Sequence, residues 1–95
     1  MLTIKKAKLE NLEDVAPLFD LYRVFYNQES NLEAALVFLR DRISKKESII
    51  FVAYDTNVPA GFTQLYFTFS SVSLQPSLIL NDLFVKKEYR KKYIG

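Results

Sequence analysis

Residues 80–95 read LNDLFVKKEYRKKYIG, and this stretch decides how the rest of the chain is interpreted. Its first half is apolar and suits a β-strand, whereas its second half gathers Lys and Arg side chains. A strand that leads into a helix N-terminus beside such side chains is typical of a phosphate-binding site, because free backbone amides and the helix dipole attract anions. The stretch therefore predicts an anion site at the end of a strand.

The composition of the chain excludes several kinds of chemistry. The 95 residues are 49% hydrophobic and 25% charged, which is typical of one globular domain. Because the chain has neither Cys nor His, thiol nucleophiles, thiolate metal sites and His general bases are excluded, and we expect no metal site. With two Gly in the chain, neither a P-loop nor a dinucleotide-binding glycine motif can be formed.

The charge balance and the apolar runs bear on the partners of the chain. The formal net charge of +2 is too small to argue for nucleic acid, and the basic cluster has no helix beside it that could read bases. No apolar run is long enough to span a bilayer. The first six residues are not followed by the apolar h-region of a signal peptide, so we expect none. We therefore expect no nucleic-acid partner, no membrane and a cytoplasmic location.

The hydrophobic periodicity predicts an α+β fold in the order β-α-α-β-β-β. A short strand over residues 2–7 precedes a helix that Asn11 caps, and the box Ser30-x-x-Glu33 predicts the cap of a second helix. The run 49–54 is typical of a strand buried on both faces, and two further strands are predicted at 61–69 and 77–85. Three consecutive strands favour an antiparallel meander covered by the helices, so residues 1–95 are interpreted as one domain.

This order of elements resembles the GNAT superfamily of acyl-CoA-dependent N-acyltransferases. The segments FVA at 51–53 and AGF at 60–62 resemble the family's second and third strands, and LNDLFV at 80–85 resembles its fourth. The segment from Glu88 to Gly95 resembles the family's pyrophosphate loop, Arg/Gln-x-x-Gly-x-Gly/Ala, although Tyr93 stands where the first glycine is usual. Family members continue for another helix, strand and helix. The resemblance therefore implies the N-terminal part of such a domain, incomplete at 95 residues.

The resemblance implies a binding site for acetyl-CoA, the acyl donor of the family. Its pantetheine arm would pair with the strand backbone, and its pyrophosphate would lie in the loop. The implied cofactor-binding residues are Leu83, Phe84, Val85, Arg90, Lys91, Lys92, Tyr93, Ile94 and Gly95. On charge alone the basic cluster is more typical of a solvated terminus than of a phosphate site, and the preceding strand is what favours the phosphate site.

Three residues are candidates for catalysis and acceptor binding. Asp82 would share a strand face with Leu80 and Phe84, and a carboxylate there could take the proton of an amine. The alternative is that Asp82 only accepts backbone hydrogen bonds. Tyr26 and Glu29 fall where the family often borders its acceptor pocket. The alternatives are an ordinary core aromatic for Tyr26 and a solvated loop carboxylate for Glu29.

Two hypotheses of function follow from the resemblance. The first is an N-acetyltransferase that transfers an acetyl group from acetyl-CoA to a primary amine, borne by a small molecule or a protein. We expect an enzyme for a full-length parent and weak or absent activity for these 95 residues. The second is a non-catalytic module that forms homodimers or higher oligomers, because the apolar strand at residues 77–85 would be an exposed sheet edge.

Overall fold

The computed structural model describes residues 1–90 and confirms the predicted α+β order. A four-stranded sheet carries two α-helices, and two short 3-10 helices, η1 and η2, follow β1 and β4. The elements are β1 (Leu2–Lys6), η1 (Leu9–Asn11), α1 (Leu12–Phe25), α2 (Leu32–Ser44), β2 (Ser48–Asp55), β3 (Val58–Ser70), β4 (Gln75–Val85) and η2 (Lys87–Tyr89). No helix among these residues is long and apolar enough to cross a membrane.

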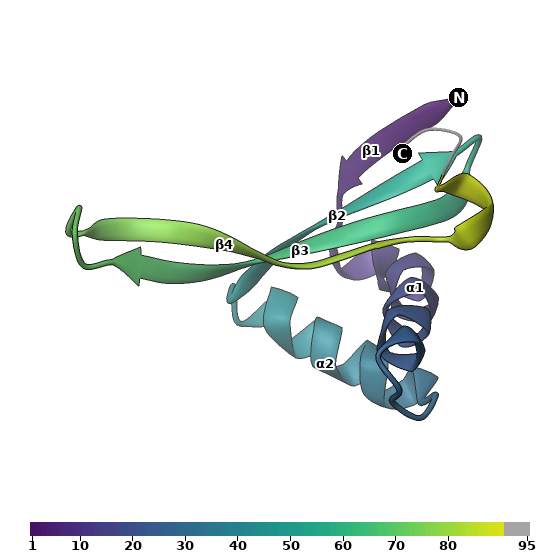
Figure 1. Ribbon diagram of the computed structural model, residues 1–95, viewed down its shortest axis with the longest axis horizontal. Helices are drawn as coiled ribbons and strands as arrows, with labels where there is room; N and C mark the ends of the chain where they lie inside the picture. Colours follow the sequence, from purple (N-terminus) through teal and green to yellow (C-terminus); the bar gives the residue numbers. More distant parts are fainter. Residues whose placement is uncertain (91–95) are drawn as a thin grey trace.

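The sheet is antiparallel throughout, in the order β1-β2-β3-β4, and both helices lie against one of its faces (Figure 1). The core lies between this face and the helices, where Leu18, Leu39 and Val52 are fully buried. The prediction that residues 49–54 are buried on both faces is wrong. Phe51 is 37% exposed, because alternate side chains of β2 point to the face that the helices do not cover.

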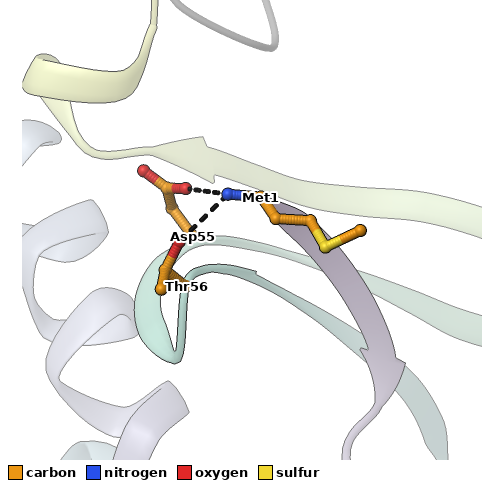
Figure 2. A network of polar contacts seen from close by, with 3 residues as sticks. All are labelled: Met1, Asp55 and Thr56. Carbon is orange, nitrogen blue, oxygen red and sulfur yellow. Dashed lines mark hydrogen bonds and ion pairs between the residues drawn. The ribbon is translucent and has the colours of Figure 1, made fainter.

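The first strand is tied to the β2–β3 turn at the start of the chain. The ammonium group of Met1 donates to Asp55 Oδ1 at 3.1 Å and to Thr56 Oγ1 at 3.0 Å (Figure 2). The backbone N–H of Thr56 in turn donates to the carbonyl oxygen of Met1. These contacts fix the register of β1 at one end of the sheet.

The corner between α1 and α2 is organised by a buried carboxylate. Asp20 accepts from the Ser30 hydroxyl and, at 2.7 Å, from the backbone N–H of Asn31. Asn31, rather than Ser30, caps α2, and its Oδ1 accepts from the Ala34 N–H at 3.0 Å. The predicted capping box of Ser30 and Glu33 is therefore wrong, because the Ser30 hydroxyl is directed to Asp20 in the preceding helix.

A bulge in β4 changes which side chains share a face. Gln64 pairs with Asp82 and Leu65 pairs with Leu80, so Asn81 is an additional residue in β4. Asp82 therefore faces the helices together with Phe84, whereas Leu80 lies on the opposite face and is 57% exposed. The prediction that all three residues share a face is wrong for Leu80, because the simple alternation does not continue through a bulge.

Beyond the bulge the β3–β4 hairpin extends past both helices (Figure 1). Its apolar side chains are exposed, among them Phe69 at 80% and Leu74 at 88%. The whole stretch between Asp55 and Asp82 contains no charged residue. The hairpin is thus an apolar, uncharged arm whose outer edge has no partner strand among residues 1–90.

Candidate functional site

The C-terminal end of β4 presents free backbone groups at the edge of the sheet. The N–H of Lys86 donates to the carbonyl oxygen of Ala60 on β3. Because hydrogen-bonded pairs alternate in an antiparallel ladder, Phe84 also bonds to β3, whereas Leu83 and Val85 direct their N–H and C=O groups outward. Of the three predicted pantetheine-binding residues, two therefore offer outward backbone groups.

Phe84 instead supports the site through its side chain, which is 9% exposed. Its ring makes an edge contact with Tyr22 of α1, at 6.2 Å between centroids. Gly61 allows β3 to approach closely here, because a Cβ on this residue would lie 2.7 Å from the carbonyl oxygen of Phe84. The close strand approach and the buried ring together position the backbone of β4.

Arg90 closes the end of this edge. Its Nε donates to the carbonyl oxygen of Val85 at 2.7 Å, and its guanidinium lies 5.5 Å from the ring centroid of Phe84 and 5.7 Å from that of Phe25. A cavity of about 300 Å³ opens here, and we call it the edge cavity. It is lined by Tyr22, Phe25, Tyr26, Leu83, Phe84, Val85 and Arg90. The other predicted loop residues, Lys91, Lys92, Tyr93, Ile94 and Gly95, lie outside the described residues.

Asp82 is 5% exposed and is held by side-chain donors. Gln64 Nε2 donates to its Oδ2 at 2.9 Å, and Asn81 Nδ2 donates to its Oδ1 at 3.0 Å. Gln64 itself is fully buried and accepts from the Ser48 hydroxyl at 2.8 Å. The carboxylate is therefore fixed in orientation by a network that crosses from β2 through β3 to β4.

Two tyrosines beside Asp82 stay protonated at neutral pH. Burial, followed by a hydrogen bond with the Asp82 carboxylate, raises the pKa of Tyr22 to about 12. Burial, followed by the Asp82 charge, also raises the pKa of Tyr66. Both phenols are thus available as hydrogen-bond donors rather than as bases.

Asp82 also lines a second cavity, of about 320 Å³, which we call the aspartate cavity. Its lining comes from both helices, their connection and the sheet: Phe19, Tyr22, Arg23, Tyr26, Gln28, Phe38, Tyr66 and Asp82. Tyr22 and Tyr26 line both cavities, so the two spaces adjoin along α1. The structure brings the predicted residues Asp82 and Tyr26 together here. Glu29 lies exposed in the helix connection and lines neither cavity.

One lining residue, Arg23, has no counterpart among the predicted site residues. It lies three residues before Tyr26, so helical spacing alone would have placed it beside this tyrosine. The sequence pattern gave no reason to choose it, because a single Arg on a helix is usually solvated.

A larger cavity, of about 550 Å³, lies away from this site between β1, the end of α2 and β2. Its lining includes Lys6, Glu10 and Ile43 but neither the outward backbone of β4 nor the Asp82 network. Size alone therefore does not identify the functional cavity. Within the described part of the chain, no group of three or more acidic side chains is placed to hold a metal ion.

Known proteins resemble this chain in sequence and in fold. No family model matches the chain. The uncharacterized N-acetyltransferase YhfO of Bacillus subtilis is 47% identical over 94 residues, which is 99% of this chain and 63% of that protein. The crystal structure of a probable acetyltransferase is 44% identical, with a TM-score of 0.87 over 94% of this chain and 60% of that one. The chain thus spans about three fifths of the length of these relatives.

A more distant structure extends the likeness of fold. A predicted acetyltransferase from Clostridium acetobutylicum, solved with acetyl-CoA, has a TM-score of 0.78 at 10% identity, over 99% of this chain and 66% of that one. At this identity the likeness shows the fold alone. The two solved structures share the arrangement of sheet and helices with this chain.

Proposed function

Because the chain has the fold of the N-terminal portion of a GNAT-type acetyltransferase, we propose that it binds acetyl-CoA at the edge of β4 and transfers the acetyl group to a primary amine. One observation carries this proposal. The outward backbone of Leu83 and Val85 borders the edge cavity, and this cavity adjoins the aspartate cavity through Tyr22 and Tyr26. A donor at the edge and an acceptor beside Asp82 would therefore meet along α1.

The donor is a thioester whose pantetheine arm carries two amides. These amides complement the outward N–H and C=O groups of Leu83 and the outward N–H of Val85 in the way that a neighbouring strand would, while the C=O of Val85 accepts from Arg90. Arg90 supplies further N–H donors near the end of β4, beyond the one that it gives to Val85. The pyrophosphate cradle at residues 91–95 remains a prediction.

The chemistry is a direct transfer between the two substrates. The amine nitrogen attacks the thioester carbonyl carbon, a C–N bond forms, and the C–S bond then breaks to release CoA. Asp82 accepts the proton that the amine loses, and this proton then passes to the departing thiolate, directly or through water. The outward N–H groups of β4 stabilise the negative charge that develops on the carbonyl oxygen. Tyr22 holds the Asp82 carboxylate in place and does not act as a base.

Binding of acetyl-CoA is the direct test of the donor site. We expect Leu83→Pro to abolish most of the affinity measured by calorimetry, because proline lacks the outward N–H and that group does not bond to β3. Leu83→Ala is the matched control, since it shortens the same side chain and keeps the N–H. Loss of affinity in both variants, or in neither, would contradict the proposed role of the β4 backbone.

Transfer is tested separately from binding, because the chain spans 63% of its Bacillus relative. Release of the CoA thiol is followed with a panel of primary amines, and Asp82→Asn is compared with the unmodified chain. We expect Asp82→Asn to lower turnover by about a hundredfold or more while acetyl-CoA binding persists, as for loss of a general base. Unchanged turnover in this variant would remove Asp82 from the catalytic role.

A second candidate function is self-association, and the uncharged arm favours it. Sheet edges in monomeric proteins are usually protected by charged side chains, whereas the arm exposes Ile79 and Leu80 at an edge without a charge. Two copies could pair their β4 edges about a two-fold axis and bury these side chains.

Sedimentation tests the self-association directly. We expect a dimer or larger species at micromolar concentration, and we expect Leu80→Lys to shift it toward monomer because it places a charge on the arm. Val37→Lys is the matched control, since Val37 is 44% exposed on α2 and lies outside the arm. A monomer at all concentrations would exclude this second function.

A further inference from the structure

The aspartate cavity combines aromatic walls with opposite charges. Asp82 is its acidic residue, and Arg23 belongs to the same lining. Among its lining residues, Phe19 stacks on Tyr22 and on Phe38, with ring centroids 6.2 and 5.7 Å apart. Its volume of about 320 Å³ is at the small end of the range for ligand sites, about 300–1,000 Å³. The space therefore suits a small molecule with a compact apolar body.

Asp82 has room for one further donor. Its two oxygens accept from Gln64 and Asn81, the Tyr22 phenol lies close enough for the carboxylate to raise its pKa, and a carboxylate offers about four acceptor positions. An ammonium group entering the cavity would meet this remaining position, with aromatic rings on either side that attract cations.

Arg23 is available for an anion. Among residues 1–90 its side chain takes part in no ion pair and no hydrogen bond. It also lines an adjoining cavity of about 330 Å³ together with Phe19 and Phe38, so it stands between two open spaces. The lining of the aspartate cavity thus holds one cationic side chain, Arg23, and one carboxylate, Asp82.

We propose that the acceptor bound in the aspartate cavity is a primary amine that also carries a carboxylate, with its ammonium group at Asp82 and its carboxylate at Arg23. Its use as an acetyl acceptor rests on the proposed function, but its binding does not. A guanidinium matches a carboxylate through two parallel N–H donors, so Arg23 selects for this group and not merely for size. The acceptor class is accordingly a free amino acid or a similar zwitterion.

A matched set of probes tests the proposal without acetyl-CoA. L-phenylalanine and phenethylamine differ by the carboxylate alone, and 3-phenylpropionate lacks the amine. We expect the chain to bind L-phenylalanine about fivefold more tightly than phenethylamine, as for a partly exposed ion pair, and 3-phenylpropionate most weakly. The dissociation constants come from NMR titrations that follow the amides of Tyr22 and Gln28. Equal binding of the first two probes, or no binding of any probe, would overturn the proposal.

Variants of Arg23 separate its charge from its packing. We expect Arg23→Gln to remove the fivefold preference while phenethylamine binds as before, and Arg23→Lys to restore part of it. Arg40→Gln, on the exposed side of α2, is the control and keeps the full preference. If Arg23→Gln weakens the binding of both probes by the same factor, the role of Arg23 is structural and the proposal fails.

The two proposals fail in different ways. A chain that prefers L-phenylalanine over phenethylamine but does not bind acetyl-CoA contradicts the acetyltransferase function and supports the zwitterion site. A chain that binds acetyl-CoA but does not distinguish the two amines contradicts only the zwitterion site.

Discussion

The inner and outer halves of the β3–β4 hairpin are made of the same two strands and have opposite surroundings. The inner half, residues 58–64 with 82–85, lies against the helices and buries Gln64 and Asp82. The outer half, residues 65–70 with 75–80, begins beside the helices at Tyr66, extends beyond them and exposes Phe69 and Leu80. Polar side chains are thus buried where the hairpin is covered, and apolar side chains are exposed where it is not.

This contrast in burial shows that the two halves are stabilised in different ways. A buried amide and carboxylate are stable only when they are fully hydrogen-bonded, and the inner half supplies those partners. The outer half has no charge to keep it soluble, so its exposed side chains are suited to contact with another surface. The bulge at Asn81 separates the two halves. Because Asn81 is an additional residue, the β4 side chains on one side of it lie on the opposite sheet face from the one that simple alternation across it would give.

The largest contrast is expected from removing one aromatic ring in each half. Phe62 is 3% exposed and contacts the rings of Phe19 and Tyr22, so Phe62→Ala should lower the free energy of unfolding by about 3–5 kcal/mol. Phe69→Ala, at an 80% exposed position, should change it by less than about 0.5 kcal/mol. Urea unfolding measures the free energy of unfolding of both variants. Similar losses of stability in the two variants would contradict the division of the hairpin into a covered inner half and an uncovered outer half.

The next contrast concerns a glutamine in each half. Gln64→Leu leaves the Ser48 hydroxyl and one oxygen of Asp82 without their partner, so we expect a loss of about 2–4 kcal/mol. Gln75→Leu, at the exposed start of β4, should be nearly neutral. Thermal unfolding followed by circular dichroism compares them, and a stable Gln64→Leu variant would mean that the network is not required.

A smaller effect is expected where the inner strands approach most closely. A methyl group on Gly61 would meet the carbonyl oxygen of Phe84 and the Cα of Val85, so Gly61→Ala should cost about 1–3 kcal/mol. The displaced strand should also weaken acetyl-CoA binding, if β4 carries that site. Ser71→Ala in the exposed turn is the control for both measurements, and an unchanged Gly61→Ala variant would show that the strands can separate without loss.

The order of elements was predictable because each helix and strand carries its own period of apolar residues. Two features depended on contacts that are distant in sequence and were not predictable. Ser30 fits a local capping box, but its hydroxyl donates to Asp20 in the preceding helix, so Asn31 caps α2. Asn81 fits a regular strand, but the pairing with β3 makes it a bulge.

The location of one candidate residue follows from its position in a strand. Asp82 was chosen for its place on the fourth strand and for the resemblance to a family that often carries an acidic residue there, and it lines a cavity together with Tyr26. Arg23 was not predicted, since nothing in a single helix indicates which of its charged residues will line a cavity against the sheet. Glu29 was chosen for its place in the helix connection, but it is exposed and lines neither cavity, and Asp20 binds the next two residues of that connection, Ser30 and Asn31.

The smallest contrast tests how Asp82 is coupled to α1. Tyr22→Phe removes one donor to the carboxylate and should lower the free energy of unfolding by about 1 kcal/mol near neutral pH. The pKa of Tyr22 is raised from 10.0 to about 12 in the folded chain, so the stabilisation is complete below pH 10 and is lost as the pH rises through about 12. The stability difference between the chain and its Tyr22→Phe variant should therefore shrink over that interval.

Tyr54 provides the comparison for this pH dependence. Its pKa is also raised to about 12, by burial and by its hydrogen bond to Asp14, but it lies on β2 and lines neither cavity. Tyr54→Phe should show the same alkaline convergence of stability and leave amine binding unchanged, whereas Tyr22→Phe should alter both. Urea unfolding across the alkaline range, combined with the amine titrations, distinguishes them. A Tyr22→Phe variant with a constant stability deficit and normal amine binding would mean that the phenol only packs against Phe84 and does not orient Asp82.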